Sequence, residues 1–300
     1  MGTFVSSNNT LLYGPGILRW LWTEFKQNDW LFPKLFAVES SSKQYEKLAS
    51  MFGIENVPSK TENENYAIAD VANGYNKTFT HTEYGLVLKH SLVAEEDELY
   101  GFLSQFPEFL RRASIHTIET QAHAVINALD STAGPDGDYY LSTSHPSLVG
   151  DQSNTPATQI DLGYTSLQAA KTSILNMKSH EGHPIVNNDQ MNLVVSPTLW
   201  AMVEQLLKGD KQPFSANNTV NVLQGMFTPI VDPYVTDTNG WYIMRKPNKS
   251  GAIFFWRVKP SIKEYVDPNN DARAIRERFR FSNGIMDWRQ SIVYGSTGTA

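Results

Sequence analysis

The chain has 300 residues, of which 41% are hydrophobic and 12% aromatic, and its formal net charge is -6. This length allows one large domain or two modest ones, and a compact chain of this size buries about 75% of its unfolded surface. The acidic balance argues against a dedicated nucleic-acid binder, which is usually basic. The absence of cysteine excludes disulfides, thiol catalysis and cysteine-based zinc sites.

No apolar run in the sequence reaches the roughly 18 residues that a membrane span requires. The first residues also lack the basic and apolar stretches of a secretory signal. We therefore expect a protein with no membrane partner that is made in a reducing cytoplasm.

Residues 1–58 are predicted to form an N-terminal arm rich in aromatic side chains. Helical turns are expected near residues 17–27 and 41–51. Two interpretations of the arm stay open: its aromatic residues form a surface that another molecule covers, or they pack on their own domain. The large aromatic side chains concerned are Trp20, Trp22, Phe25, Trp30, Phe32 and Phe36.

Residues 59–92 predict a β-hairpin. A first strand is expected at 66–71, followed by Asn73-Gly74 as a tight-turn pair and a second strand over 75–88, rich in Thr, Tyr, Phe and Val. Arms of about 12 residues would reach roughly 40 Å. Because a compact chain of this length has a radius of gyration of only about 19 Å, we expect this hairpin to project from its domain.

The strongest helical signal lies in the segment 93–190. Acidic residues 95–98 suit a helix start, and an apolar stripe follows as far as Phe106. Pro107 suits the first turn of a second helix, predicted over 107–130 with a length of about 36 Å. A further helix is predicted at 166–177.

Strands and one helix mix in the segments 191–251 and 252–300. The helix is expected over 199–207, with Ser196 as N-cap and Pro197 in its first turn. The strands do not alternate strictly with helices, so the sequence favours an α+β fold over a doubly wound sheet. The predicted strands are 191–195, 241–244, 252–258 and 278–281.

Two groups of residues that contain histidine are candidate metal sites. His180 and His183 are three residues apart, whereas zinc peptidase helices need histidines at i and i+4, so a solvated loop is expected. His116, Glu119 and His123 share a face of the predicted helix 107–130 and could hold a metal. A polar stripe on a half-exposed helix is the favoured interpretation.

A hydrolase site could be imagined from Ser142, Ser144 and His145 with Asp136 or Asp138. The chain lacks the Gly-x-Ser-x-Gly turn of a nucleophile elbow and any glycine-rich phosphate loop. The aspartates are expected to build a tight turn with the intervening glycine. We therefore expect no catalytic residue, no cofactor and no metal.

The densest basic cluster lies near the C-terminus and alternates with acidic and apolar residues. Ion pairing with a neighbouring molecule is at least as well supported there as phosphate contact. The cluster comprises Arg273, Arg276, Arg278 and Arg280.

Three phrases occur in a fixed order: 136–146 (DGDYYLSTSHP), 193–203 (LVVSPTLWAMV) and 231–242 (VDPYVTDTNGWY). In this order they resemble blocks of the major capsid subunits of tailed phages, especially the Mu-like major head subunits. Residues 281–289 (FSNGIMDWR) resemble a further block. The resemblance spans residues 60 to 290 and rests on the colinear series as a whole.

The resemblance implies a Hong Kong 97-like fold. Its parts would be an N-terminal arm (1–58), an E-loop hairpin (59–92), a peripheral domain (93–190) with spine helix 107–130, an axial domain (191–251) and a return to the peripheral domain (252–300). It further implies a structural protein, not an enzyme, that assembles as hexamers and pentamers into the icosahedral head of a virion. The head would enclose double-stranded DNA without sequence-specific binding. Scaffold, portal or decoration proteins are the other implied partners.

Assembly would use surfaces on the arm, the hairpin and the basic cluster. An encapsulin-like shell around protein cargo and, less favoured, a soluble hydrolase using Ser144 or His145 are the alternatives. The interface residues predicted on this basis are Trp20, Trp22, Trp30, Lys77, Phe79, Tyr84, Arg276 and Arg278.

Overall fold

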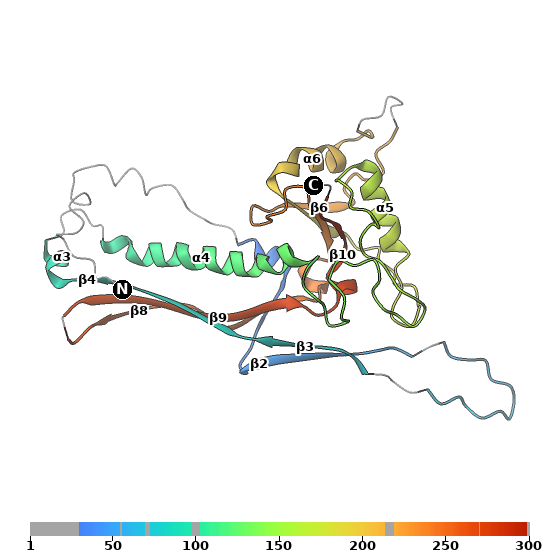
Figure 1. Cartoon of the computed structure of the whole chain (residues 1–300), viewed down its shortest axis with the longest axis horizontal. Coiled ribbons are helices and arrows are strands. Elements are labelled where there is room, and N and C mark those ends of the chain that lie inside the picture. The colour runs from blue at the N-terminus through green and yellow to red at the C-terminus, as the bar shows by residue number, and fades with distance from the viewer. Residues whose placement is uncertain are drawn as a thin grey trace.

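The computed structural model describes residues 30–54, 56–69, 73–97, 103–213, 219–269 and 271–298. The chain forms an extended molecule with a long sheet, a second sheet at one end and a two-stranded ribbon that runs away from both (Figure 1). Helices accompany mainly antiparallel strands, which confirms the predicted α+β class. The helix expected at 17–27 lies outside the described residues.

The first sheet is built on one long hairpin. Its strand order is β1 (Ala37–Ser40), β8 (Ala252–Val266), β9 (Arg273–Ile285) and β4 (Thr82–His90). The predicted strands at 252–258 and 278–281 are present, but pairing continues from Ala252–Ile285 to Val266–Arg273. The far half of β8 is exposed on both sides, so it lacks the apolar alternation by which a strand is recognised.

Helix α4 (Phe106–Ala124) lies along one face of this sheet (Figure 1). Pro107 occupies its first turn as predicted, because the missing amide hydrogen has no partner there in any helix. Leu110, Ile118 and Ala122 recur at helical spacing and are buried against the sheet. The helix is shorter than the predicted 107–130 and is followed by a 3-10 turn, Ile126–Ala128.

The helix expected to start in the acidic run at 95–98 starts earlier. Helix α3 spans Leu92–Glu96, and the Ser91 hydroxyl accepts a hydrogen bond from the Ala94 amide at 3.1 Å. This side-chain cap fixes the start of the helix, which places the acidic residues at its end. A 3-10 turn, Leu103–Gln105, precedes α4.

The second sheet has the order β10 (Ile292–Ser296), β7 (Trp241–Met244), β5 (Met191–Val195) and β6 (Phe227–Val231). Strands β5 and β7 are short apolar runs buried along their whole length, as expected for strands covered on both faces. Helices α5 (Tyr164–Leu175) and α6 (Trp200–Lys208) share the core of this sheet. The strands and helices predicted here are confirmed.

Two details of this region differ from the predictions. The Ser196 hydroxyl bonds the Thr238 carbonyl at 2.7 Å and makes no cap; a 3-10 turn, Pro197–Leu199, leads into α6. The elements that pack with this sheet also extend beyond the predicted boundaries at 191 and 252. Helix α5 precedes the first boundary and β10 follows the second, yet both pack in the core of the second sheet.

The segment from Trp30 to Ser40 packs in the core between the two sheets and ends as a strand of the first sheet. Phe32 and Phe36 are buried in the core that joins them, and Trp30 packs edge-on against Phe32 at 5.3 Å. For this part of the arm, packing on the chain's own body is therefore the correct interpretation. Short helix α2 (Phe32–Leu35) and strand β1 carry the segment through.

The ribbon consists of β2 (Tyr45–Met51) and β3 (Asn73–Thr80), paired antiparallel. The helix predicted at 41–51 is thus wrong: its few apolar residues fit both periods, and pairing with β3 selects the strand. Gly74 belongs to β3 and makes no tight turn with Asn73. A Cβ on Gly74 would lie 2.8 Å from the Ser50 carbonyl carbon, so glycine permits the close approach of the two strands.

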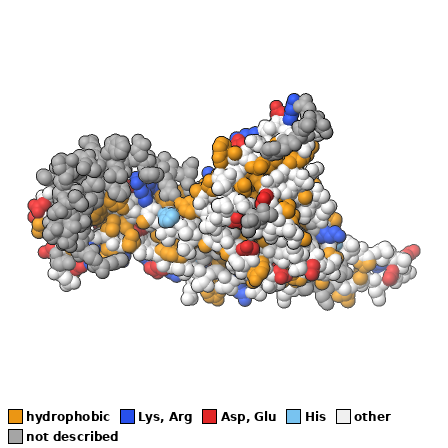
Figure 2. Space-filling view, turned by 45° about the horizontal axis from the view of Figure 1, so that its top comes forward, with side chains coloured by type: hydrophobic (Ala, Val, Ile, Leu, Met, Phe, Trp, Pro, Cys, Tyr) orange, Lys and Arg blue, Asp and Glu red, His pale blue; other side chains and the backbone are white. Residues whose placement is uncertain are grey.

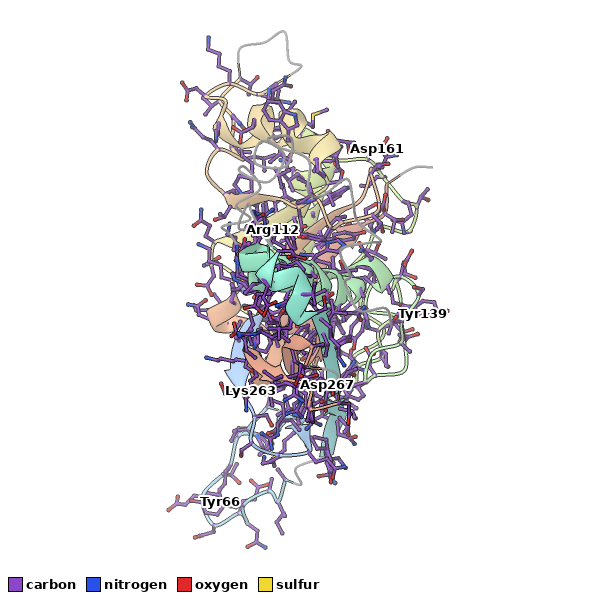
Figure 3. The ribbon with its side chains drawn as sticks, turned by 90° about the vertical axis from the view of Figure 1, so that its left-hand side faces the viewer. Tyr66, Arg112, Tyr139, Asp161, Lys263 and Asp267 are labelled. Atoms are coloured by element: carbon purple, nitrogen blue, oxygen red, sulfur yellow. The ribbon has the colours of Figure 1, made fainter. Side chains whose placement is uncertain are left out.

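Residues 52–54 and 56–69 connect the ribbon strands without helix or strand, so the first arm predicted at 66–71 is wrong over its described part, 66–69. This projecting loop extends away from the body (Figure 1), with hydrophobic and acidic side chains along it (Figure 2) and Tyr66 pointing outward (Figure 3). Val57, Tyr66 and Ile68 are 92%, 83% and 95% exposed. Projection is thus confirmed for this loop, but the predicted hairpin 59–92 is wrong in its last part, because residues 82–90 form β4 and pair with β9 in the first sheet.

Candidate assembly site

The ribbon is fixed to the body where β3 crosses the face of the first sheet opposite α4. Phe79 is 2% exposed and meets Phe255 at 5.3 Å between ring centroids. Gly284 of β9 lies directly beneath, since a Cβ there would be 3.0 Å from the Phe79 ring. The glycine lets β3 lie close to the sheet, so this contact sets the position of the ribbon's root.

Lys77 adds a second contact at the root. Its Nζ donates a hydrogen bond to the Tyr140 hydroxyl and lies 5.0 Å from the ring centroid. The Tyr140 hydroxyl in turn donates to the Ile285 carbonyl at 2.9 Å. Among the described residues no carboxylate forms an ion pair with Lys77, and burial lowers the pKa of its amine.

We expect Lys77→Met to raise the free energy of unfolding by about 1 kcal/mol, because a partly desolvated charge without an acidic partner is removed while the apolar stem remains. Lys89→Met is the matched control, since Lys89 pairs with Asp267 at 3.0 Å and this variant should therefore not gain stability. Urea unfolding of both variants measures the difference. A loss in Lys77→Met larger than in the control would show that the amine is required.

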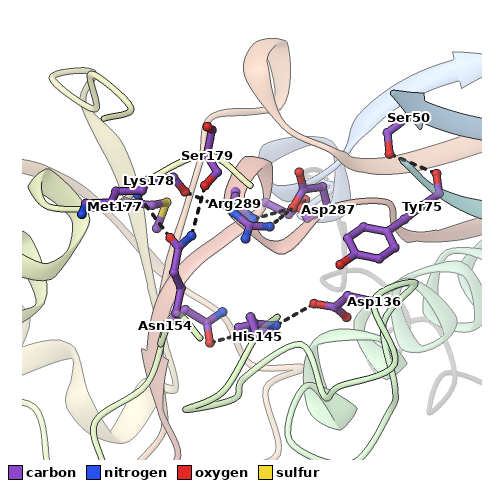
Figure 4. Close-up of polar contacts among 12 residues, drawn as sticks. Ser50, Tyr75, Asp136, His145, Asn154, Met177, Lys178, Ser179, Asp287 and Arg289 are labelled. Carbon is purple, nitrogen blue, oxygen red and sulfur yellow. Dashed lines mark hydrogen bonds and ion pairs between the residues drawn. The ribbon is translucent and has the colours of Figure 1, made fainter. Parts of the chain in front are cut away.

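His145 is the centre of a buried polar cluster beside the root (Figure 4). Its Nδ1 lies 2.7 Å from Asp136 Oδ2 and its Nε2 lies 3.2 Å from Asn154 Oδ1. The Asn154 amide nitrogen donates to the Tyr140 and Ile292 carbonyls, so its oxygen must face the histidine. The imidazole stacks on the Trp288 indole at 4.2 Å.

Asp287 and Arg289 close the cluster from the end of β9. Asp287 Oδ1 accepts the Arg289 amide at 2.9 Å, and the guanidinium lies 4.4 Å from the Trp288 ring centroid. Burial, with the charge of Asp136, raises the pKa of Asp287. The Tyr75 hydroxyl of the ribbon points toward Asp136 (Figure 4). We call Tyr75, Lys77, Asp136, Tyr140, His145 and Asp287 the root cluster.

The root cluster has no hydrolase geometry. Both nitrogens of His145 are occupied by Asp136 and Asn154, so neither can accept a proton from a serine. The Ser142 hydroxyl instead accepts the Ser144 amide at 3.1 Å. Gly137 takes a positive φ of 94°, as the predicted aspartate-glycine turn requires. The alternative with a soluble hydrolase therefore lacks its nucleophile and base.

The segment containing His180 and His183 forms a partly exposed loop with a turn at Gly182, as predicted. It also contacts the start of the projecting loop, which was not predicted. The His180 ring stacks on Phe52 at 3.8 Å, and Glu181 accepts the Gly53 amide. His183 Nε2 lies 3.1 Å from the Ile54 carbonyl. A contact between segments this far apart in the sequence leaves no local pattern, and sequence reasoning missed it for that reason.

The histidines of α4 also differ from their prediction. His116 is exposed, but Glu119 and His123 are 1% and 0% exposed, so they form no half-exposed stripe. Within the described ranges, no group of three His, Asp or Glu side chains is arranged to hold a metal ion.

The face of the first sheet that α4 does not cover is basic. Alternation along the paired strands brings Lys263, Arg276 and Val87 side by side on it. Glu83 pairs with Arg278 at 2.5 Å, and Asp267 pairs with Lys89 at 3.0 Å. We call this surface the outer face; its basic residues are Lys89, Lys263, Arg276, Arg278 and Arg280.

The predicted interface residues differ in whether another molecule could reach them. Arg276 is exposed and Arg278 is partly exposed, so both are available to another molecule. Phe79 is buried, and Tyr84 stacks on Phe279 and Phe281 at 5.5 and 5.1 Å, so these two are packed inside their own subunit. Lys77 and Trp30 likewise contact their own chain, whereas Trp20 and Trp22 lie outside the described residues.

Comparison with known families and structures gives a consistent result. A family model described as phage capsid protein matches residues 77–293. That range includes α4, the end of β3, the root cluster except Tyr75, and both sheets except β1 and the end of β10. No curated protein matches the chain.

Solved capsid structures share the fold. The decorated capsid of bacteriophage JBD30 superposes with a TM-score of 0.60 at 12% identity over 78% of this chain and 100% of that chain. The capsid of cyanophage P-SCSP1u gives 0.61 at 10% identity, over 97% and 98%. Mycobacterium phage Cain gives 0.54 at 13% identity, over 99% and 98%. In the described part of the chain, no helix has the length and hydrophobicity to cross a membrane.

Proposed function

Because this chain belongs to the phage capsid protein family, we propose that its copies build a closed head by docking the projecting loop of each on the outer face of the next. The chain is a structural major capsid protein, not an enzyme, and its place is the virion. The encapsulin-like and hydrolase alternatives are not favoured. The observation that carries the proposal is the exposed, extended loop on a ribbon that is anchored at its root.

The two surfaces are complementary in charge. In the projecting loop, Glu62 and Glu64 are exposed and outnumber Lys60. On the outer face, Arg276 and Lys263 are exposed and have no carboxylate partner among the described residues. Opposite charges at this kind of contact steer association and fix its register.

The surfaces are also complementary in hydrophobicity. On the projecting loop, the side chains of Val57, Tyr66 and Ile68 leave apolar area in water that a neighbouring subunit could cover. On the acceptor side, Tyr265 is 42% exposed beside the basic residues. A heterologous contact of this type, repeated round a rotation axis, closes a ring.

The family's architecture is proposed for this chain with adjusted boundaries. The ribbon and projecting loop would be the E-loop, α4 the spine helix, and the second sheet with α5 and α6 the axial domain. Hexamers and pentamers would enclose double-stranded DNA, which the net charge of -6 would not bind tightly. Synthesis would occur in the host cytoplasm, with scaffold and portal proteins as partners. The JBD30 capsid carries minor capsid protein trimers, which supports a decoration protein as a further partner.

A charge swap tests the docking contact. We expect Glu62→Lys with Glu64→Lys to abolish shells, because two attractive charge pairs become repulsive at every contact of the shell. Arg276→Glu with Lys263→Glu should do the same. Arg278 is unsuitable because Glu83 already holds it. Electron microscopy and light scattering at low salt, where screening is weakest, measure shell yield.

The combination of all four substitutions is the matched control. It reverses the sign of both surfaces, so shells should reappear if the loop meets the outer face. Failure of the combined variant, with each double variant still folded, would place the partner of the loop elsewhere. Normal shells in both double variants would show that these charges take no part.

A further inference from the structure

A buried joint connects α4 to the two segments packed beside it. Glu119 accepts the Leu31 amide at 2.7 Å through Oε1 and the Phe32 amide at 3.1 Å through Oε2. One turn later, His123 Nε2 forms an ion pair with Asp232 Oδ2 at 2.7 Å. Asp232 directly follows β6, and its amide donates to the Val195 carbonyl of β5 at 2.9 Å. The joint thus links α4, α2 and the second sheet.

Both ring nitrogens of His123 face oxygen acceptors. Nδ1 lies 2.6 Å from the Glu119 carbonyl, and Nε2 lies 2.7 Å from the Asp232 carboxylate. A neutral imidazole carries one hydrogen, so its other nitrogen would direct a lone pair at an oxygen. Nε2 and Asp232 Oδ2 are not aligned as a hydrogen bond, but a lone pair 2.7 Å from a carboxylate oxygen would be repelled by it. The geometry therefore points to a hydrogen on both nitrogens and a positive charge on the ring.

The surroundings supply negative charge but almost no water. Glu119, His123 and Asp232 are 1%, 0% and 0% exposed. Glu119 Oε2 is 3.5 Å from His123 Nδ1, and the Tyr234 ring stacks on the imidazole at 5.1 Å. His116 lies beyond Tyr234, with 6.0 Å between the ring centroids, and α2 contributes only backbone amides. The charged groups that act on His123 are therefore Asp232 and Glu119.

We propose that His123 is a buried cation whose proton holds this joint together, so that mildly alkaline pH loosens α4 from both the Leu31–Phe32 segment and the second sheet. Removal of the proton leaves the carboxylates of Glu119 and Asp232 near each other in a site with almost no water. The ring nitrogen that loses its hydrogen then repels the oxygen that it faces. The joint is thus a pH-sensitive connection inside the subunit. It does not depend on shell formation.

The direction of the pH effect follows from the same contacts. Burial alone lowers the pKa of His123, but Asp232 and Glu119 outweigh it, so the pKa of the folded state lies above the usual value. The stabilisation is therefore complete below the unfolded pKa of about 6.5 and disappears as the pH rises through the folded pKa. Burial also raises the pKa of Glu119, against its two amide donors, and this acts in the same direction.

Urea unfolding of the full chain between pH 6 and pH 9.5 tests the proposal under conditions without assembly. In the wild type, the ratio of folded to unfolded protein should fall about tenfold for each pH unit between the unfolded and the folded pKa of His123. Hydrogen exchange, corrected for its intrinsic pH dependence, should accelerate at Leu31 and Phe32 over the same range. In His123→Gln the fall should be smaller, and exchange at Leu31 and Phe32 should no longer accelerate with pH.

His116→Gln is the matched control, because His116 is exposed on the same helix and its loss should leave the wild-type profile unchanged. Equal pH dependence in wild type and His123→Gln would overturn the proposal. If His123→Gln does not fold, nitrogen NMR of the wild type decides, with signals assigned among the seven histidines. Two protonated ring nitrogens on His123 at pH 7, above the pKa of a free imidazole of about 6.5, are expected, and a single one would contradict the inference.

Discussion

Replacing residues 53–71 with Asn-Gly should give a folded subunit that forms no closed shells. Met51 and Asn73 already pair across the ribbon, so a tight turn can join the strands after Phe52. The variant loses the contacts of Gly53 and Ile54 with the loop at 180–183, but a shorter loop costs less entropy to close. We therefore expect a change of only about 1 kcal/mol in the free energy of unfolding, with shell yield below detection by electron microscopy.

The truncated subunit also provides a sharper readout in mixtures. It keeps the outer face and so can accept a neighbour's loop, but it has no loop to offer in return. Small fractions added to wild-type subunits should therefore terminate growing shells. Replacing Val57, Tyr66 and Ile68 with serine in the full-length loop separates the effect of apolar area from that of loop length, because this variant removes apolar area and keeps the length. Normal shells from the truncated subunit alone would refute the docking role of the loop.

His145→Ala should lower the free energy of unfolding by about 2–4 kcal/mol, because it removes a buried ring and leaves two buried acceptors without a donor. The substitution leaves the Asp136 carboxylate and the Asn154 carbonyl without their donor and removes the ring from Trp288. Urea unfolding at constant pH measures the loss. The ribbon should be affected with it, because Tyr75 and Lys77 rest on the same cluster.

Ser144→Ala is the control for this variant. Ser144 is exposed on the same segment, and the two ring nitrogens of His145 are bonded to Asp136 and Asn154 instead of its hydroxyl. Its replacement should change the free energy of unfolding by less than about 0.5 kcal/mol. A loss below about 1 kcal/mol in His145→Ala would show that Asp136 and Asn154 find other partners.

Elements with strong local signals were predictable from the sequence. Pro107 and the apolar spacing after it identified α4, and the buried runs of β5 and β7 identified the second sheet. The colinear phrases indicated the family, and two of them, 136–146 and 281–289, supply Asp136, Tyr140, His145 and Asp287 to one cluster. A local pattern or a fixed phrase can be recognised within one segment, without knowledge of its partners in the fold.

Elements that depend on a distant partner were not predictable in the same way. The segment 45–51 has too few apolar residues for its periodicity to distinguish a strand from a helix. It forms a strand because it pairs with β3. The sequence did not indicate the roles of Gly74 and Gly284, because each glycine allows a strand that is distant in the sequence to lie close to it. Likewise, the spacing of His116 and His123 indicated a shared face but could not indicate that Asp232 lies opposite one of them.

The order of these parts along the polypeptide has a consequence for synthesis. The projecting loop emerges from the ribosome early, whereas β8 and β9, which form the outer face, emerge near the end. Strand β1 must also wait for β8, since Ala37 pairs with Ile253. A nascent chain can thus present its loop before it has a face to receive one, which restricts the first docking events to finished neighbours.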